Sequence, residues 1–259
     1  MIRSLKNSAA GINALQSRID AAAGNIAGVN TDAYKAEKPT FSDLVYEKMA
    51  DSGRPVKASG ENKPAAGSGS RQVAVLRDFS QGDLRETGRE TDLAISGKGF
   101  FRVQLPDDST AYTRNGNFRV NAEGQLVTQD GYLVYPEVDL PEGYKEILVD
   151  KNGKIQVTGA DGSATDVADL NIYNFVNPSG LRPMGGNLFA ATDESGPEEE
   201  GLPGQEGLGQ LVQKSLESSN VDLASEMTGI MESQRAYQMN ARALRMADDM
   251  WGMANNLRK

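Results

Sequence analysis

The chain has 259 residues, a formal net charge of −9, and neither histidine nor cysteine. Its acidic balance argues against a nucleic-acid partner, because nucleic-acid-binding proteins carry a basic face to neutralise phosphates. The missing cysteines exclude a disulfide framework and thiolate chemistry, and the missing histidines remove the commonest general base and metal ligand.

The N-terminal segment has no features of a cleaved signal peptide or a membrane span. Arg3 and Lys6 lie near the start, but Asn7, Asn13 and Gln16 interrupt every apolar stretch that follows. No run approaches the roughly 18 apolar residues that cross a bilayer. We therefore expect no membrane insertion, and either a cytosolic protein or one exported without a cleaved signal.

Residues 1–30 show the spacing of an amphipathic helix. Alternating steps of three and four residues join Ile2, Leu5, Ala9, Ile12, Gln16, Ile19, Ala23 and Ile26. This narrow apolar stripe is typical of a coiled-coil seam. Further along the chain, residues 50–71 are rich in glycine and proline and poor in apolar side chains, which predicts a flexible linker.

The segment over 83–185 changes to a period of two, with short strands between glycine turns. The turns are predicted at Asn115-Gly116, Glu123-Gly124, Asp130-Gly131, Asn152-Gly153 and Asp161-Gly162. The stretches over 125–128, 132–135 and 154–158 are rich in β-branched, aromatic and other apolar residues, as strands are. The pattern predicts an antiparallel all-β domain.

Residues 193–206 carry six carboxylates and no basic side chain, with glycines and prolines among them. A cation site is conceivable there, but a solvated linker is the favoured interpretation.

The C-terminal segment repeats the spacing of the N-terminal helix. Its stripe consists of Leu223, Met227, Ile230, Gln234, Tyr237, Ala241, Leu244, Asp248 and Trp251. Ser219 or Asn220 is expected to cap this helix, with Asp222 in its first turn. Matching stripes at both ends suggest that the ends pair; two amphipathic helices packed on the chain's own core are the alternative that periodicity leaves open.

No pattern of side chains in the sequence matches a known catalytic or ligand-binding motif in full. Gly97-Lys98-Gly99 lacks the rest of a phosphate-binding loop, and Asp150 to Ile155 lacks the flanking carboxylates of a calcium loop. Phe100, Phe101 and the aromatic residues over 112–118 suit core packing better than a stacking platform for sugars or single-stranded nucleic acid. We expect no catalytic, cofactor-binding or metal-ligating residues and no enzymatic activity; a secreted carbohydrate-binding β module is the alternative from another class.

Five ordered motifs resemble the flagellar rod and hook protein family over nearly the whole chain. They lie at residues 23–35, 80–84, 92–101 and 112–118, with a C-terminal signature split between 218–222 and 234–240. Length and body motifs are most similar to the distal rod branch, with a proximal rod or other axial subunit as the alternative. The resemblance implies a structural subunit of the basal-body rod that forms a rigid helical tube and carries torque from motor to hook.

The combined interpretation is an α+β protein. Residues 1–35 and 215–259 are expected to form a helical coiled-coil domain, 36–82 and 186–214 extended linker or second-layer segments, and 83–185 a central antiparallel β domain. The resemblance implies export through the flagellar type III apparatus to the periplasm, and contacts with other copies, with proximal rod and hook proteins, and with ring bushing proteins.

The expected assembly interface combines both helical stripes with two motif residues. Its members are Ile2, Leu5, Ile12, Ile19, Ile26, Asn30, Tyr34, Leu223, Met227, Ile230, Tyr237, Leu244 and Trp251.

Overall fold

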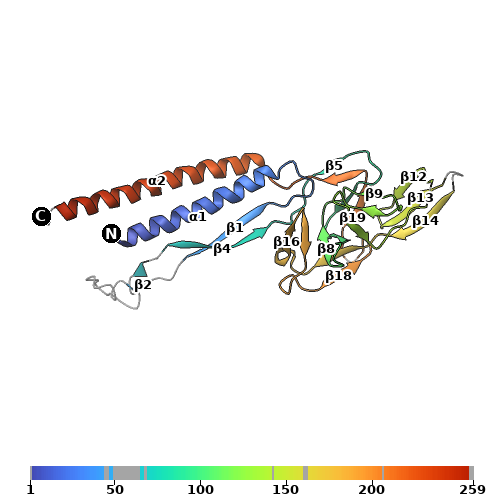
Figure 1. Cartoon of the computed structure of the whole chain (residues 1–259), viewed down its shortest axis with the longest axis horizontal. Coiled ribbons are helices and arrows are strands. Elements are labelled where there is room, and N and C mark those ends of the chain that lie inside the picture. Colours follow the sequence, from blue (N-terminus) through green and yellow to red (C-terminus); the bar gives the residue numbers. More distant parts are fainter. Residues whose placement is uncertain are drawn as a thin grey trace. The chain divides into compact units, whose positions relative to one another are not determined.

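The computed structural model describes residues 2–43, 47–48, 65–66, 69–141, 143–159, 163–205 and 207–256. Two long helices, α1 (Ile2–Ala27) and α2 (Leu223–Asn256), lie at the two ends of the chain, with strands between them (Figure 1). This order of elements confirms the predicted α+β class.

The strands are β1 (Glu37–Asp43), β2 (Glu47–Lys48), β3 (Ala65–Ala66), β4 (Ser70–Arg77), β5 (Leu84–Glu86), β6 (Leu93–Ser96), β7 (Phe101–Gln104), β8 (Thr110–Thr113), β9 (Arg119–Val120), β10 (Leu126–Val127), β11 (Leu133–Tyr135), β12 (Glu146–Val149), β13 (Lys154–Thr158), β14 (Ala164–Asp169), β15 (Ile172–Phe175), β16 (Arg182–Gly185), β17 (Leu188–Ala190), β18 (Glu198–Gly201), β19 (Gln210–Gln213) and β20 (Ser215–Glu217). A short 3-10 helix covers Pro178–Gly180.

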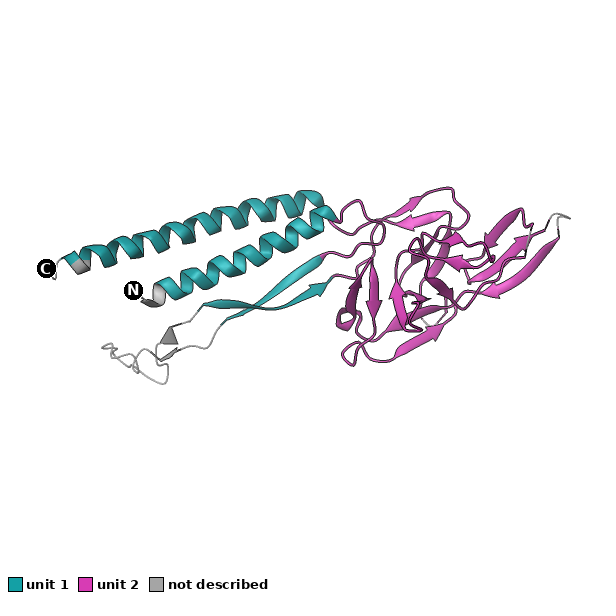
Figure 2. Ribbon diagram, in the orientation of Figure 1, with its two compact units in different colours: residues 1–27, 37–77, 222–259 teal, residues 28–36, 78–221 magenta. Residues whose placement is uncertain are grey.

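The chain divides into two compact units (Figure 2). Unit 1 contains residues 1–27, 37–77 and 222–259, and unit 2 contains residues 28–36 and 78–221. These boundaries differ from the expected ones, because residues 28–35 belong to the β-rich unit 2 and not to the helical unit. Several expectations lie outside the described residues: the Ile2 side chain, most of the 50–71 tract, the Asp161-Gly162 turn and Glu206.

In unit 1, α1 and α2 pack against each other in antiparallel directions. Gly11 lies beside Asn240, and the Asn25 side chain donates a hydrogen bond of 2.8 Å to Glu226, so the end of α1 meets the beginning of α2. The antiparallel β1–β4 ribbon also contacts α1. Contact between the terminal helices is therefore observed, while coiled-coil geometry stays a prediction.

Helix α2 begins later than the expected capping residues. Asp222 accepts a hydrogen bond of 3.1 Å from the backbone N–H of Ala224, as an N-cap carboxylate does. The prediction that Ser219 or Asn220 caps the helix is wrong, because the Asn220 side chain binds backbone groups of two other segments of unit 2. The N-cap is Asp222, which was expected in the first turn of the helix.

Unit 2 is built from antiparallel strands around a closed interior. Its largest sheet has the order β16-β17-β8-β7-β11-β10-β9, and β12-β13-β14 form a second sheet. Strands β15–β18, β19–β6 and β20–β5 form pairs. Buried apolar side chains such as Phe101, Ile155 and Leu211 fill the main core. An aromatic cluster around Phe100, Tyr173 and Phe189 forms a second one.

Three predicted hairpin turns in unit 2 are confirmed. Gly124, Gly131 and Gly153 have positive φ angles of 82°, 87° and 90°, and they connect the paired strands β9–β10, β10–β11 and β12–β13. The Asn115-Gly116 pair is different, since β8 and β9 are not paired with each other. Glycine is needed there for close approach, because a Cβ at Gly116 would lie 1.6 Å from the carbonyl oxygen of Leu93.

The predicted linker over 186–214 is corrected by the structure. It contains β17 and β19, which pair with β8 and β6. Its acidic tract contains β18, whose register pairs Phe175 with Glu198 and Ile172 with Gly201. The carboxylates are tolerated because they find partners: Glu198 accepts a hydrogen bond from the Tyr112 hydroxyl, and Glu200 accepts one from Asn171. Charge density alone therefore gave the wrong assignment for a paired edge strand.

Candidate assembly surface and buried ion cluster

Helix α2 places its methionines on the side away from α1. All six of them are between 46% and 65% exposed. Met239, Met246 and Met253 are spaced by seven residues, so they fall along one line of the helix. We call the outward surface formed by Met227, Met231, Met239, Met246, Met250 and Met253 the methionine face.

The two buried residues in the described part of α2 are small and lie on the opposite side. Ser233 and Ala247 are 1% and 4% exposed, and Gly229, Ile230 and Leu244 are half-buried. The predicted stripe included Gln234 and Asp248, but both are exposed. The residues just before them, Ser233 and Ala247, are the buried ones. Small side chains let two helices approach closely, and the methionines lie outside the pair.

The predicted interface residues fall into two classes of exposure. In α1, Leu5, Ile12, Ile19 and Ile26 are half-buried, as are Ile230 and Leu244 in α2. Leu223, Met227, Tyr237 and Trp251 are exposed by 41% to 55%. Asn30 is exposed and Tyr34 is half-buried, and both belong to unit 2. Their role in assembly stays a prediction.

Unit 2 contains a buried ion cluster that sequence analysis did not find. The carboxylate of Glu217 accepts hydrogen bonds from Lys35 Nζ at 2.6 Å, from Arg114 Nε at 2.9 Å and from the backbone N–H of Gly82 at 2.9 Å. The side chains of Lys35 and Glu217 are fully buried. One carboxylate is therefore shared by two cations in an environment where an unpaired charge is costly.

The charges in this cluster shift the protonation of its members. Burial alone would raise the pKa of the Glu217 carboxyl, but Arg114 and Lys35 outweigh it and hold that pKa below its usual 4.5. Burial lowers the pKa of Lys35 against the opposing effect of Glu217. Backbone carbonyls also support the cations: Arg114 donates to Gly97 and Gly99 at 2.8 and 2.7 Å, and Lys35 donates to Ser80 at 2.7 Å.

The family-like motifs converge on this cluster. Lys35 ends the first motif, Gly82 lies in the second, and Arg114 lies in the fourth. Asn220, from the C-terminal motif, accepts a hydrogen bond from the Ala36 N–H at 2.8 Å and donates to the Asp78 and Ser80 carbonyls at 2.8 and 3.1 Å. Short motifs far apart in sequence thus build one junction, a proximity that their order along the chain does not reveal.

Unit 1 contains a comparable asparagine clamp. Asn25 is 1% exposed, and its side chain forms two hydrogen bonds with the backbone of Glu37. It donates to the Glu37 carbonyl at 2.9 Å and accepts from the Glu37 N–H at 2.7 Å. The clamp fixes the start of β1 against α1, because a buried amide that lost these partners would be costly to leave unpaired.

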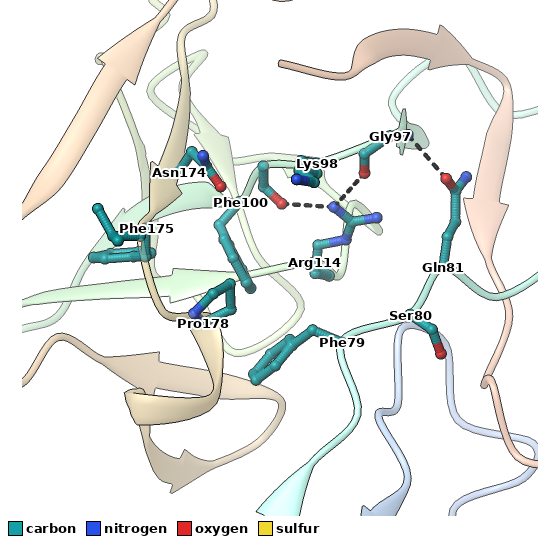
Figure 3. Close-up of a pocket in the computed structure, with 12 residues that line it drawn as sticks. Phe79, Ser80, Gln81, Gly97, Lys98, Phe100, Arg114, Asn174, Phe175 and Pro178 are labelled. Atoms are coloured by element: carbon teal, nitrogen blue, oxygen red, sulfur yellow. Dashed lines mark hydrogen bonds between the residues drawn. The ribbon is translucent and has the colours of Figure 1, made fainter. Parts of the chain in front are cut away.

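A cavity of about 530 Å³ in unit 2 lies beside Arg114 (Figure 3). Phe79, Phe100 and Phe175 contribute its apolar wall. Gln81 also lines it, and its side chain accepts a hydrogen bond from the Gly97 N–H at 2.9 Å and donates one to the Ile95 carbonyl at 3.4 Å. Phe100 and Phe175 are nearly buried and pack edge-to-face at 5.9 Å between centroids. Phe101, Tyr112 and Phe118 are buried in the two cores, as the core-packing interpretation predicted.

The remaining candidate motifs occupy ordinary connections. Gly97-Lys98-Gly99 joins β6 to β7, whereas a phosphate-binding loop would lead into a helix. Asp150 to Gly153 form the turn between β12 and β13. Within the described ranges, no group of three or more acidic side chains lies close enough to hold a metal ion, and no helix is both long and apolar enough to cross a membrane.

Comparisons with known proteins agree with these features. Residues 94–157 match the flagellar hook protein FlgE/F/G D1 domain, and residues 212–257 match the flagellar basal body rod FlgEFG protein C-terminal domain. The flagellar basal-body rod protein FlgG of Borreliella burgdorferi is 38% identical, with 100% of both chains covered. FlgG of Agrobacterium fabrum is 40% identical over 96% of this chain and 97% of its own. The hook-basal body complex protein FlhP of Bacillus subtilis is 32% identical over both full lengths.

An antiparallel β body between two long terminal helices, together with both domain matches, defines a structural protein of the flagellar hook and basal body. The chain belongs to the family of flagellar basal-body rod proteins. Within that family its full-length relatives include several FlgG proteins, and this chain is a structural rod subunit.

Proposed function

We propose that this chain polymerises into the rigid helical tube of the distal rod and passes torque from motor to hook through side-chain packing. Its partners are other copies of itself, the proximal rod and hook proteins at the ends of that section, and the ring bushing proteins. We further propose that it reaches the periplasm through the flagellar type III export apparatus without a cleaved signal peptide.

The observation that carries this proposal is the apolar outer side of α2. The methionine face, together with Leu223, Tyr237 and Trp251, exposes large apolar side chains over the length of the helix. Fully burying one such side chain stabilises a complex by roughly 1.5–3 kcal/mol, so several per subunit support strong lateral packing. The seven-residue spacing of Met239, Met246 and Met253 suits another helix as the partner.

The β1–β4 ribbon offers a second apolar surface in unit 1. Phe41, Val73, Val75 and Leu76 are between 39% and 59% exposed. A two-stranded ribbon is marginally stable by itself, and packing against a further element would stabilise it. We propose that this ribbon forms the second inter-subunit layer expected for residues 36–82.

The proposal is tested by placing charges on the methionine face. The double variant Met239→Asp and Met246→Asp, introduced into the chromosomal gene, is expected to abolish swimming because two carboxylates would have to be desolvated in each helix contact. The purified variant should keep the hydrogen-exchange protection of unit 2. The matched control is Met184→Asp, a methionine of unit 2 that is 45% exposed, which should leave motility near wild type.

Full motility of the double variant would contradict an assembly role for this face. Loss of protection in unit 2 would instead show that the charges act through folding, and the single variants would then replace the double one.

A further inference from the structure

The distribution of methionine in this chain is uneven. Six of the nine methionines lie in α2, and the structure buries none of those it describes. Methionine is ordinarily a flexible filler of hydrophobic cores. Here the buried core clusters among the described residues of unit 2 contain aromatic and aliphatic side chains and no methionine, and six thioethers are gathered on one exposed helix face.

The methionine face is also chemically accessible. Because the chain has no cysteine, methionine supplies all of its sulfur. Each thioether on the face belongs to a side chain that is about half exposed before any partner covers it. Three pairs are three or four residues apart, which makes their side chains neighbours on the helix surface. They are Met227 with Met231, Met246 with Met250, and Met250 with Met253.

We propose that the methionine face is a site of reversible oxidation by peroxides that blocks the docking of a second copy of this chain. This inference rests on the assembly role proposed above. The thioether sulfur attacks one peroxide oxygen, the O–O bond breaks, and the products are a methionine sulfoxide and water. Sulfur is oxidised by two electrons and the peroxide is reduced by two.

The reverse step is the one that methionine sulfoxide reductases catalyse. Two thiols of the reductase become a disulfide, the sulfoxide oxygen leaves as water, and the thioether returns. The consequence for packing follows from polarity. A sulfoxide oxygen is a strong acceptor, and burying it in an apolar helix contact without a donor is unfavourable.

The second copy is the occupant to which this inference commits, for two reasons. The relatives that match over nearly the full length include the rod proteins of Borreliella burgdorferi and Agrobacterium fabrum. The seven-residue line of Met239, Met246 and Met253 also fits a helix of the same kind. Packing would cover the sulfurs, so susceptibility is confined to the subunit before incorporation. Peroxide would then inhibit the addition of free subunits and would not affect subunits already packed in the tube.

The experiment compares the full-length chain with a variant in which the six methionines of the face are replaced by leucine. Both are treated with hydrogen peroxide, the excess is removed, and peptide mass spectrometry measures sulfoxide at each position, including Met184. Sedimentation velocity then measures self-association over a range of concentrations. We expect the concentration for half-association of wild type to rise by about tenfold or more after oxidation, and that of the leucine variant to stay unchanged.

Treatment of the oxidised wild type with a methionine sulfoxide reductase and a thiol should restore its association. This arm needs no mutation, so it holds even if the leucine variant folds poorly. Unchanged association of wild type carrying sulfoxide at the six positions would overturn the inference, as would equal loss in the leucine variant. Untreated wild type that stays monomeric at every concentration would contradict the assembly role itself, and the oxidation inference with it.

Discussion

In unit 2, aromatic and branched side chains fill two closed cores, whereas unit 1 turns its largest apolar side chains outward. Among the described residues, the buried hydrophobic side chains of unit 1 are Ala22 and Ala247. Unit 2 buries residues as large as Tyr173, Phe101 and Phe189. The difference indicates that unit 2 holds its fold with its own contacts, while unit 1 leaves apolar surface for partners to cover.

The two units also treat charge differently. Unit 2 buries Lys35, Arg114 and Glu217 together, and the cluster can be stable only when all three segments that supply it are present. In unit 1, the ion pair between Arg77 and Glu37 is partly exposed and therefore contributes less. If the two units are stabilised differently, variants in each should have separable effects on stability and assembly.

The largest effect is expected from two deletions that differ by nine residues. Removing residues 1–27 deletes α1 alone, so motility should be lost while the strands of unit 2 keep their hydrogen-exchange protection. Removing residues 1–36 also takes away Lys35 and the N–H of Ala33 that binds the Glu217 carbonyl at 2.7 Å. Unit 2 should then lose more than about 3 kcal/mol of unfolding free energy. Equal protection in both shortened chains would show that unit 2 does not need the segment over 28–36.

Next in size is Glu217→Gln. It leaves Lys35 and Arg114 buried without their shared carboxylate, and we expect unit 2 to lose about 3–5 kcal/mol in urea unfolding. Lys35→Met should cost less, about 1–3 kcal/mol, because Arg114 still pairs with Glu217. Glu199→Gln on exposed β18 serves as the control and should be nearly neutral. A larger loss for Lys35→Met than for Glu217→Gln would contradict the arrangement of one anion between two cations.

The two asparagine clamps provide a smaller, matched comparison. Asn220→Ala removes the partners of the Ala36 N–H and the Asp78 carbonyl, and it should destabilise unit 2 by about 1–3 kcal/mol. Asn25→Ala removes both backbone bonds to Glu37, and it should speed hydrogen exchange in β1 with little change in unit 2. Exchange that accelerates throughout both units in either variant would show that they do not unfold separately.

The smallest effect concerns pH. The pKa of Glu217 is lower in the folded chain than its usual 4.5, so its ionised form stabilises the fold fully above that pH. This stabilisation is lost as the pH falls through the lowered folded pKa. The difference in unfolding free energy between wild type and Glu217→Gln should therefore narrow between neutral pH and about pH 3. A constant difference over that range would mean that Glu217 is not the group that titrates.

Local patterns along the chain predicted much of this fold. The three- and four-residue spacing predicted both helices, and glycine after Asn, Asp or Glu predicted the turns that became the β9–β10, β10–β11 and β12–β13 hairpins. These signals act over a few residues, because backbone conformation and one-sided burial are set by near neighbours. The linker prediction for residues 193–206 was wrong because local signals do not show distant partners. Glu198 and Glu200 of strand β18 are hydrogen-bonded by residues from elsewhere in the sequence.

The sequence by itself thus determined the class of elements, the absence of histidine and cysteine chemistry, and the motifs that resemble the family. Tertiary structure alone decided which side of α2 meets α1, with Ser233 and Ala247 inward and the methionines outward. It also decided that Lys35 and Glu217, 182 residues apart, share a buried contact. Periodicity in the sequence predicts that a helix has an apolar face, but it does not predict which element packs against that face. A contact between distant residues depends on the free energy of the whole packed unit.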